Sequence, residues 1–119
     1  MSAFTPIPQT SMDWERNVLG SRVTRLRTDG AMLTVVQGLA GDSVPEHGYT
    51  RGSVTYVVSG RIQIGGAVLG AGEAGTYTAP GGYFSVKFLE DSTYVVARAS
   101  DDQITMPDIG ERAAHNLDA

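Results

Sequence analysis

Short runs of apolar residues, separated by glycine-containing or acidic turns, follow one another through most of this chain and constrain its fold more than any other feature. Asp29-Gly30 and Gly65-Gly66 are dipeptides typical of tight hairpins, and residues 53–59 alternate as a strand with two different faces does. The sequence shows no helical period before residue 100. The pattern predicts an all-β sandwich or barrel. The expected strands are 13–19, 22–27, 31–39, 53–59, 61–64, 67–69, 76–79, 83–89 and 92–99.

The 119 residues suffice for one domain with one core. We expect a β-barrel over residues 12–99, preceded by a surface arm over residues 1–11 that contains two prolines. Residues 100–119 do not continue the strand pattern of the preceding residues. A frayed C-terminal tail is the simpler interpretation of this segment, and a short helix that begins near Pro107 or Asp108 is the alternative.

The charge and composition exclude several classes of partner. The net charge is −4 and the nine Lys and Arg residues form no basic run, so nucleic acid is not expected as a partner. No apolar run is long enough to cross a membrane, and the N-terminal residues lack the pattern of a signal peptide. Cysteine is absent, which excludes disulfides and thiolate chemistry. We expect a cytoplasmic protein.

A stretch that contains a histidine, PEHGYTRGSVTYVVSG at residues 45–60, has the spacing of a metal-binding motif. Gly41 opens the preceding loop, His47 stands where a first histidine is required, and Gly60 closes the motif. Tyr49 and Ser53 occupy the positions of a second histidine and a glutamate. The stretch resembles the first motif of the cupin superfamily, with its metal ligands largely replaced.

A second stretch matches the other cupin motif, which ends Pro-x-Gly-x-x-His. Pro80 and Gly82 are present, Ser85 replaces the histidine, and the opening glycine is Gly75 or Gly72. Residues 31–99 therefore resemble a small, single-domain RmlC-like cupin with degenerate metal-binding motifs. The resemblance implies an antiparallel β-barrel, also called a double-stranded β-helix or jelly roll.

The ligand set that the resemblance implies is poor for a metal. A catalytic zinc or iron site uses three protein ligands drawn from His, Asp, Glu and Cys, and only His47 remains of the four family positions. Glu46 would point to the opposite face of an extended strand, and His115 lies in the tail. We expect no metal and no other cofactor, with a site built from His47, Tyr49 and Glu73 as the alternative.

The resemblance also implies which side chains face the barrel interior, because the family's metal ligands do. Residues in phase with those positions would then line the interior. Such an interior contains a histidine, phenols, hydroxyls and cations, which suits a small organic anion as the ligand. The residues concerned are His47, Tyr49, Arg51, Ser53, Thr55, Val57, Tyr83, Ser85, Lys87, Tyr94, Val96 and Arg98.

His47 is the candidate general acid or base, because an imidazole titrates near neutral pH, and Tyr49 is the candidate proton donor or oxyanion partner. A hydrogen bond from His47 to a loop carbonyl is the structural alternative. Tyr49 and Tyr83 also suit packing at the mouth of the barrel, and Arg51 suits a solvated loop.

Lys87 and Arg98 are candidate anion-binding residues. A buried cation needs a partner, so each binds either the ligand or a carboxylate of the protein. Pairing with the protein is the default, and the expected carboxylates are Glu73, Glu90 and Asp13.

If this assignment holds, an apolar stripe faces outward from the barrel. It consists of Val54, Tyr56, Val58, Ile62 and Ile64. Such a stripe packs against the other sheet, the N-terminal arm or a second subunit, and cupins commonly dimerise, so a homodimer is expected.

The sequence leaves three hypotheses about function. The first is a metal-independent cupin enzyme that acts on a small polar or anionic molecule by proton transfer, as an isomerase, lyase or cyclase, for example in secondary metabolism. The second is a non-catalytic ligand-binding or sensor cupin. The third is a metal-dependent oxygenase or hydrolase that uses His47 with atypical ligands. The fold alone does not decide among them.

Overall fold

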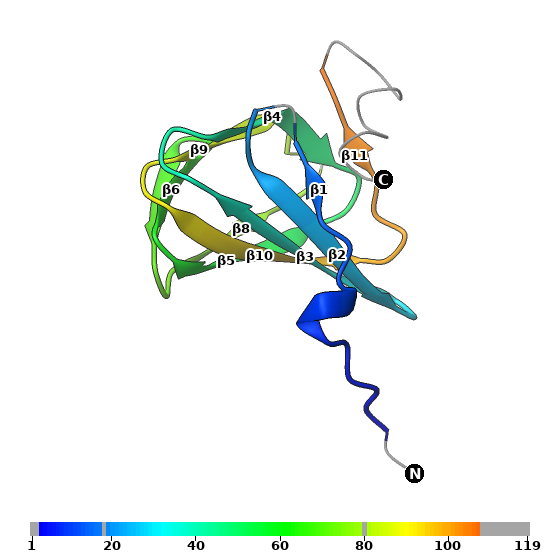
Figure 1. The fold of residues 1–119 in the computed structure, drawn as a ribbon. Helices are drawn as coiled ribbons and strands as arrows, with labels where there is room; N and C mark the ends of the chain where they lie inside the picture. Colours follow the sequence, from blue (N-terminus) through cyan, green and yellow to red (C-terminus); the bar gives the residue numbers. More distant parts are fainter. Residues whose placement is uncertain (1–2, 18, 80, 108–119) are drawn as a thin grey trace.

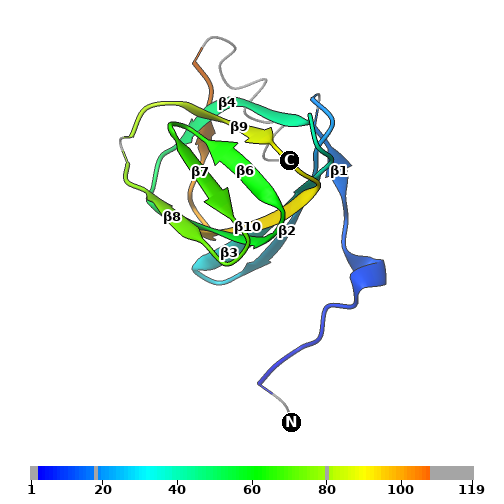
Figure 2. The same ribbon diagram turned by 90° about the vertical axis from the view of Figure 1, so that its left-hand side faces the viewer.

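The computed structural model describes residues 3–17, 19–79 and 81–107, and regular structure there is almost entirely β-strand (Figure 1). Two antiparallel sheets, ordered β1-β2-β3-β10-β5-β8 and β11-β4-β9-β6-β7, enclose the interior (Figure 2). The predicted all-β jelly-roll barrel is confirmed. The elements are η1 (Gln9–Ser11), β1 (Glu15–Arg16), β2 (Arg22–Thr28), β3 (Ala31–Gly38), β4 (Ser43–Tyr49), β5 (Ser53–Ser59), β6 (Arg61–Ile64), β7 (Ala67–Gly70), β8 (Ala74–Tyr77), β9 (Phe84–Phe88), β10 (Ser92–Ala99) and β11 (Ile104–Thr105).

The barrel has an apolar end and a polar end, because the inward-facing rows of the larger sheet change in character along the strands. The strand register aligns these rows across β2, β3, β10 and β5. From the apolar end, they are Val23, Val36, Tyr94 and Val57; then Arg25, Thr34, Val96 and Thr55; then Met32, Arg98 and Ser53. Ile62, Val86 and Phe88 of the smaller sheet complete the apolar core.

Glycine is required where β5 passes into β6. Gly60 has φ +82°, and a Cβ at this position would lie 2.7 Å from the Cα of Ser92. A side chain there would therefore be strained by both the backbone conformation and the lack of space. The glycine that closes the first sequence motif thus marks the point where the chain changes sheets.

The outward stripe predicted from the sequence is only half correct. Val54, Tyr56 and Val58 on β5 are exposed, as expected, but Ile62 is fully buried and Ile64 lines the interior. The alternation fails after Gly60 because β5 belongs to one sheet and β6 to the other. The inward and outward positions of one strand therefore do not predict those of the next strand across such a turn.

The two ends of the barrel domain differ in how they contact it. Residues 3–11 are exposed and extend away from the strands (Figure 1). Ile104 and Thr105, by contrast, pair with Tyr49 and Gly48 of β4, so this part of the segment predicted as a frayed tail is docked. Beyond Pro107, the alternative helix falls outside the described residues. No helix in the described part of the chain is long and apolar enough to span a membrane.

Candidate functional site

His47 lies at the end of β4 with its ring inside the barrel and is only 4% exposed. Its Nδ1 is 2.6 Å from the carbonyl oxygen of Pro45, and its Nε2 is 3.3 Å from the hydroxyl oxygen of Tyr49. A carbonyl can only accept a hydrogen bond, so Nδ1 carries the proton and donates it. Nε2 then has a free lone pair and accepts from the Tyr49 hydroxyl.

The surroundings keep this imidazole neutral. Burial lowers the pKa of His47 below its ordinary value of 6.5, and the positive charge of Arg98 lowers it further. The hydrogen bond to Pro45 acts in the opposite direction but is a smaller effect than burial. His47 is therefore an uncharged base at neutral pH.

We predict that the protein loses stability as the pH falls below 6.5. The unfolded chain binds a proton at this histidine near pH 6.5, whereas the native protein binds it only at its lower, folded-state pKa. Between those two values the free energy of unfolding should fall by up to about 1.4 kcal/mol per pH unit. Urea titrations at two pH values, about 7.5 and 5.5, measure this loss. It should be much smaller in a His47→Gln variant, and an equal loss in both proteins would contradict the assignment.

Tyr49 joins His47 to a cluster of aromatic rings and to a cation. Its ring centroid lies 5.3 Å from that of His47, 5.4 Å from that of Tyr77 and 5.8 Å from that of Phe84. The guanidinium of Arg98 is 4.6 Å from the centre of the Tyr49 ring. This arrangement holds the phenol in one orientation against the imidazole.

Tyr94 is a second buried phenol near the pair. Burial, together with the neighbouring Tyr49, raises the pKa of Tyr94 well above its ordinary value of 10.0. Tyr94 therefore remains a neutral hydroxyl at any physiological pH.

Arg98 faces inward as predicted, but its partner was not foreseen. Its Nε lies 2.8 Å from the Asp102 carboxylate, and both side chains are almost completely buried. Asp102 also accepts hydrogen bonds from the Thr50 hydroxyl and the Arg51 amide. The carboxylate that neutralises this cation therefore comes from the segment after β10, and none of the three carboxylates expected from the sequence fills that role.

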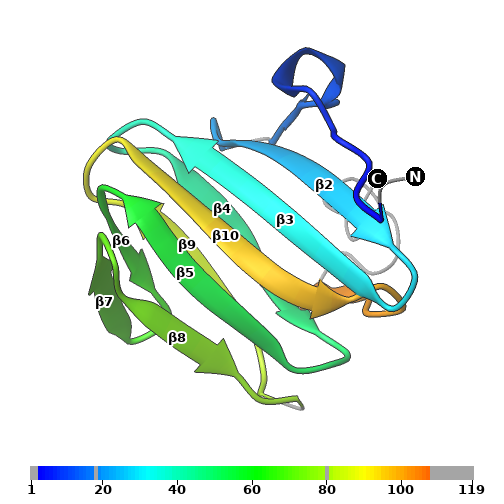
Figure 3. The ribbon, with the colours of Figure 1, turned by 90° about the horizontal axis from the view of Figure 1, so that it is seen from below.

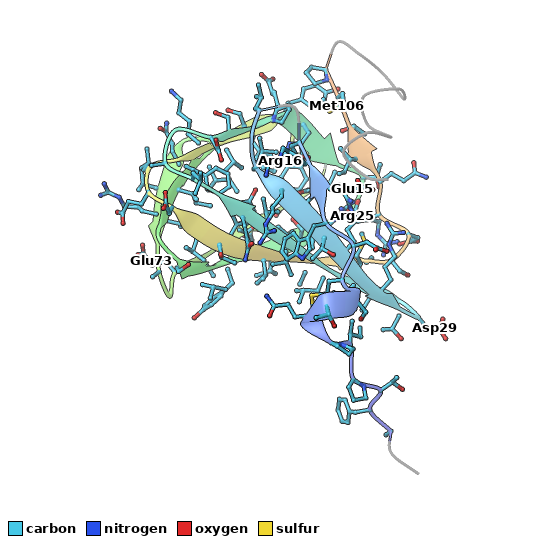
Figure 4. The ribbon with its side chains drawn as sticks, viewed as in Figure 1. Glu15, Arg16, Arg25, Asp29, Glu73 and Met106 are labelled. Carbon is cyan, nitrogen blue, oxygen red and sulfur yellow. The ribbon has the colours of Figure 1, made fainter. Side chains whose placement is uncertain are left out.

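Two of those expected carboxylates have other roles. Glu90 pairs with Arg61 at 3.3 Å. Glu73 accepts a hydrogen bond from the amide of Gly70 within the turn between β7 and β8. Figure 4 shows Glu73 across the molecule from the ion pair of Arg25 and Glu15.

The structure places five of the predicted site residues on the interior side of the strands, namely His47, Tyr49, Ser53, Tyr94 and Arg98. Ser53 is 6% exposed, and its hydroxyl has no hydrogen-bond partner among the described residues. These side chains come from β4, β5 and β10. Ser53 and Arg98 lie in the row at the polar end of the barrel, whereas Tyr94 lies in the row at the apolar end.

The prediction that Ser85 and Lys87 face the interior is wrong, because both are exposed. On β9 the inward positions are Phe84, Val86 and Phe88. The pairing of β4 with β9 is irregular between Val44 and His47, and it places Phe84 opposite His47. Motif spacing aligned Ser85 with the histidine that the second motif lacks. The inward-facing residue is instead Phe84, one position earlier.

The other two predicted residues lie at the rim. Arg51 is exposed and forms an ion pair with Asp101 at 2.9 Å, as the solvated alternative required. Tyr83 precedes β9 and is 48% exposed, so it does not face the interior. It does line a surface pocket together with Tyr49.

Tyr77 and Phe84 lie at the site but were not among the site residues predicted from the sequence. The Tyr77 hydroxyl donates to the carbonyl of Gly82 at 2.8 Å and accepts from the amide of Gly81 at 3.2 Å. Phe84 lies 4.6 Å from the His47 ring, centre to centre. An aromatic residue in a strand usually indicates packing. The only hint that Tyr77 faces inward is its position two residues after Gly75, on the same face of the strand.

Two pockets flank Tyr77. The mouth pocket, about 480 Å³, is lined by Tyr49, Thr50, Tyr77, Ala79, Tyr83 and Thr105, among others. The inner pocket, about 210 Å³, is lined by Thr55, Ile64, Leu69, Tyr77 and Phe84, among others. Tyr49 reaches the mouth pocket, whereas His47 lines neither of these two pockets. A molecule in the mouth pocket can therefore touch Tyr49 but not His47.

The donor set does not fit a metal ion. The described residues contain no group of three or more His, Cys, Asp or Glu side chains close enough to share an ion. Around His47, the positions nearest to the ring hold a phenol and a phenyl group. A catalytic metal needs more oxygen, nitrogen or sulfur donors than this site supplies.

Comparison with known proteins identifies the fold. No family model and no curated protein matches the sequence. An RmlC-like cupin from Shewanella frigidimarina matches with 17% identity, coverage of 83% of this chain and 91% of that chain, and a TM-score of 0.67. A sugar phosphate isomerase from a cupin superfamily, from Silicibacter pomeroyi, matches with 14% identity, coverage of 88% and 83%, and a TM-score of 0.70.

A third match is to a chain from a complex of two proteins. A chain in the complex of SigE with the anti-sigma ChrR from Rhodobacter sphaeroides is 22% identical, with a TM-score of 0.67. The match covers 76% of this chain but only 50% of that chain, so this chain spans about half the length of that one. Similarity at these identities shows a shared fold and leaves the chemistry to be argued from the site.

Proposed function

We propose that this chain, whose fold is that of the cupins, is a metal-independent enzyme that moves a proton within a small polar or anionic molecule. The observation that carries the proposal is the pair of His47 and Tyr49. The bare Nε2 of a neutral, buried imidazole lies 3.3 Å from the hydroxyl of Tyr49, a residue that lines an open pocket. A base whose pKa lies below neutrality, held against a proton donor, is suited to general acid–base catalysis.

In this mechanism Tyr49 is the group that touches the substrate. As the substrate loses a proton to the Tyr49 oxygen, the phenol passes its own proton to Nε2 of His47. Burial and the charge of Arg98 make the resulting imidazolium unstable, so the proton returns through Tyr49 to a different atom of the same molecule. The net change is a proton shift, an elimination or a ring closure, the reactions of an isomerase, lyase or cyclase.

The structure changes the roles proposed for the cations. Arg98 is neutralised by Asp102 and lies against the Tyr49 ring, so we assign it to positioning the phenol. Lys87 is on the outer face and takes no part in the mechanism. Hydroxyl groups of Tyr83 and Thr105, two residues that line the mouth pocket, are then the polar contacts for the substrate.

Exchange with heavy water tests the proposal even though the substrate is unidentified. The protein, dialysed against a chelator, would be incubated in D₂O with a small-molecule extract of its source organism and the products analysed by mass spectrometry. We expect one metabolite to gain deuterium or to change structure. Conversion only when a metal is restored would support the metal-dependent alternative. Binding of a metabolite with no exchange would support the sensor alternative.

We also propose that the chain forms a cytoplasmic homodimer through the outer face of the larger sheet (Figure 3). On β5 this face exposes Val54, Tyr56 and Val58. The outward positions of the adjacent β3 and β10 carry no charge, although the chain as a whole has a net charge of −4. An uncharged apolar face suits a second copy of itself, because two such faces meet without the repulsion that acts elsewhere.

The dimer prediction concerns Tyr56, a large exposed side chain of β5 on this outer face. A Tyr56→Asp substitution should raise the dimer dissociation constant at least 100-fold, because like charges would then be buried across the two-fold axis. Analytical ultracentrifugation measures the change. Val68→Asp, on β7 at a position 54% exposed, is the matched control and should leave the dimer intact. A monomeric native protein would refute the prediction.

A further inference from the structure

The inner pocket has the properties of a binding site for an apolar molecule. It lies between the two sheets, where Thr55 of β5 and Tyr77 of β8 face Ile64 of β6, Leu69 of β7 and Phe84 of β9. None of the described residues that line it is charged. Its polar side chains are hydroxyls, and the Tyr77 hydroxyl is already hydrogen-bonded to Gly82.

The volume of the pocket limits the size of its ligand. The pocket encloses about 210 Å³. In another protein, an engineered cavity of about 150 Å³ lined by Leu, Ile and Phe stays dry and binds benzene. A single six-membered ring with one or two methyl groups therefore fits here.

The inner pocket is separated from the catalytic pair. Phe84 lines the pocket and also packs against the His47 ring at 4.6 Å. Tyr77 lines both pockets and packs against Tyr49 at 5.4 Å. These two rings thus form a wall between the inner pocket and the imidazole. On the other side, Gly65 and Ala67 of the exposed β6–β7 hairpin form the rim toward solvent.

From this geometry we infer that the inner pocket binds a small, neutral, apolar ligand of about the size of toluene, separately from the molecule in the mouth pocket. The inference does not depend on the proposed enzymatic function. Such binding gains free energy from the removal of apolar surface from water, and a charged ligand would lose its hydration without gaining an ionic partner.

Titration of the ¹⁵N-labelled protein with toluene tests the inference. We expect saturable shifts of the amide signals of Leu69, Gly75 and Tyr77, and at least 10-fold weaker binding of benzoate. Shifts confined to the outer face around Tyr56, or shifts that do not saturate, would overturn the assignment.

Two substitutions on β8 form a matched pair. A Cβ at Gly75 would lie 3.4 Å from a Leu69 methyl group, an ordinary contact, and Gly75 lines the pocket. Gly75→Val should therefore fill the pocket and weaken toluene binding at least 10-fold. Ala74→Val, on the exposed face of the same strand, should leave it unchanged. If Gly75→Val does not fold, Leu69→Ala should weaken toluene binding, because it removes part of the apolar lining. Equal toluene binding in all folded variants would refute the site.

Discussion

Replacing Asp102 by alanine is expected to lower the free energy of unfolding by about 3–5 kcal/mol, the largest effect on stability that the structure predicts for a polar residue. The substitution leaves the buried Arg98 guanidinium without the carboxylate 2.8 Å away. It also removes the acceptor for the Thr50 hydroxyl and the Arg51 amide. A buried charge that loses its partner keeps its desolvation penalty, which is the physical reason for the size of the loss. Urea denaturation measures it.

The neighbouring residue provides the control. Asp101 pairs with Arg51 at a similar distance, 2.9 Å, but both side chains are more than half exposed. Water and salt screen this pair, so Asp101→Ala should cost no more than about 1 kcal/mol. Similar losses for the two variants would show that the Arg98–Asp102 pair is not buried as the structure has it.

The largest effect on activity is expected from Tyr49→Phe. The substitution keeps the ring and its packing but removes the hydroxyl that lies 3.3 Å from Nε2 of His47, on the one residue of the pair that lines the mouth pocket. Proton transfer by a positioned side chain contributes about 10²- to 10⁴-fold, so deuterium exchange should slow by that factor. The rate of exchange into the metabolite identified in D₂O is the measurement.

Two further variants make this prediction specific. His47→Gln should slow exchange by a similar factor, because the two residues act as one unit and their effects do not add. Tyr56→Phe, which removes an exposed hydroxyl on the outer face, should leave the rate unchanged. Exchange that proceeds at the native rate in Tyr49→Phe would contradict the mechanism.

The barrel could be predicted because its strands are short, regular and separated by turns. Alternation along residues 53–59 and 92–99 correctly placed Ser53 and Arg98 inside, since each segment forms one continuous strand. Alignment by motif spacing failed at Ser85, which lies on the outer face of a regularly alternating strand. Alternation failed at Ile62 because the chain changes sheets at Gly60. A period of two is informative only within an uninterrupted strand.

The contacts made across the fold were harder to foresee. Nothing local marks Asp102 as the partner of Arg98, since both the turn after β10 and the docking of β11 on β4 are needed to bury it. Tyr77 was missed for a related reason: its hydroxyl closes a loop that the sequence shows only as a run of glycine and proline. Site residues defined by tertiary contacts leave a weaker signal than those defined by strand phase.

The proton on the His47 ring tests the account most directly. Long-range ¹H–¹⁵N correlation spectra report which ring nitrogen is protonated and at what pH the ring becomes charged. We predict a neutral ring at pH 7 with its proton on Nδ1, and a pKa below 6.5. A proton on Nε2, or a charged imidazolium at pH 7, would leave Tyr49 without its proton acceptor and contradict the proposed chemistry.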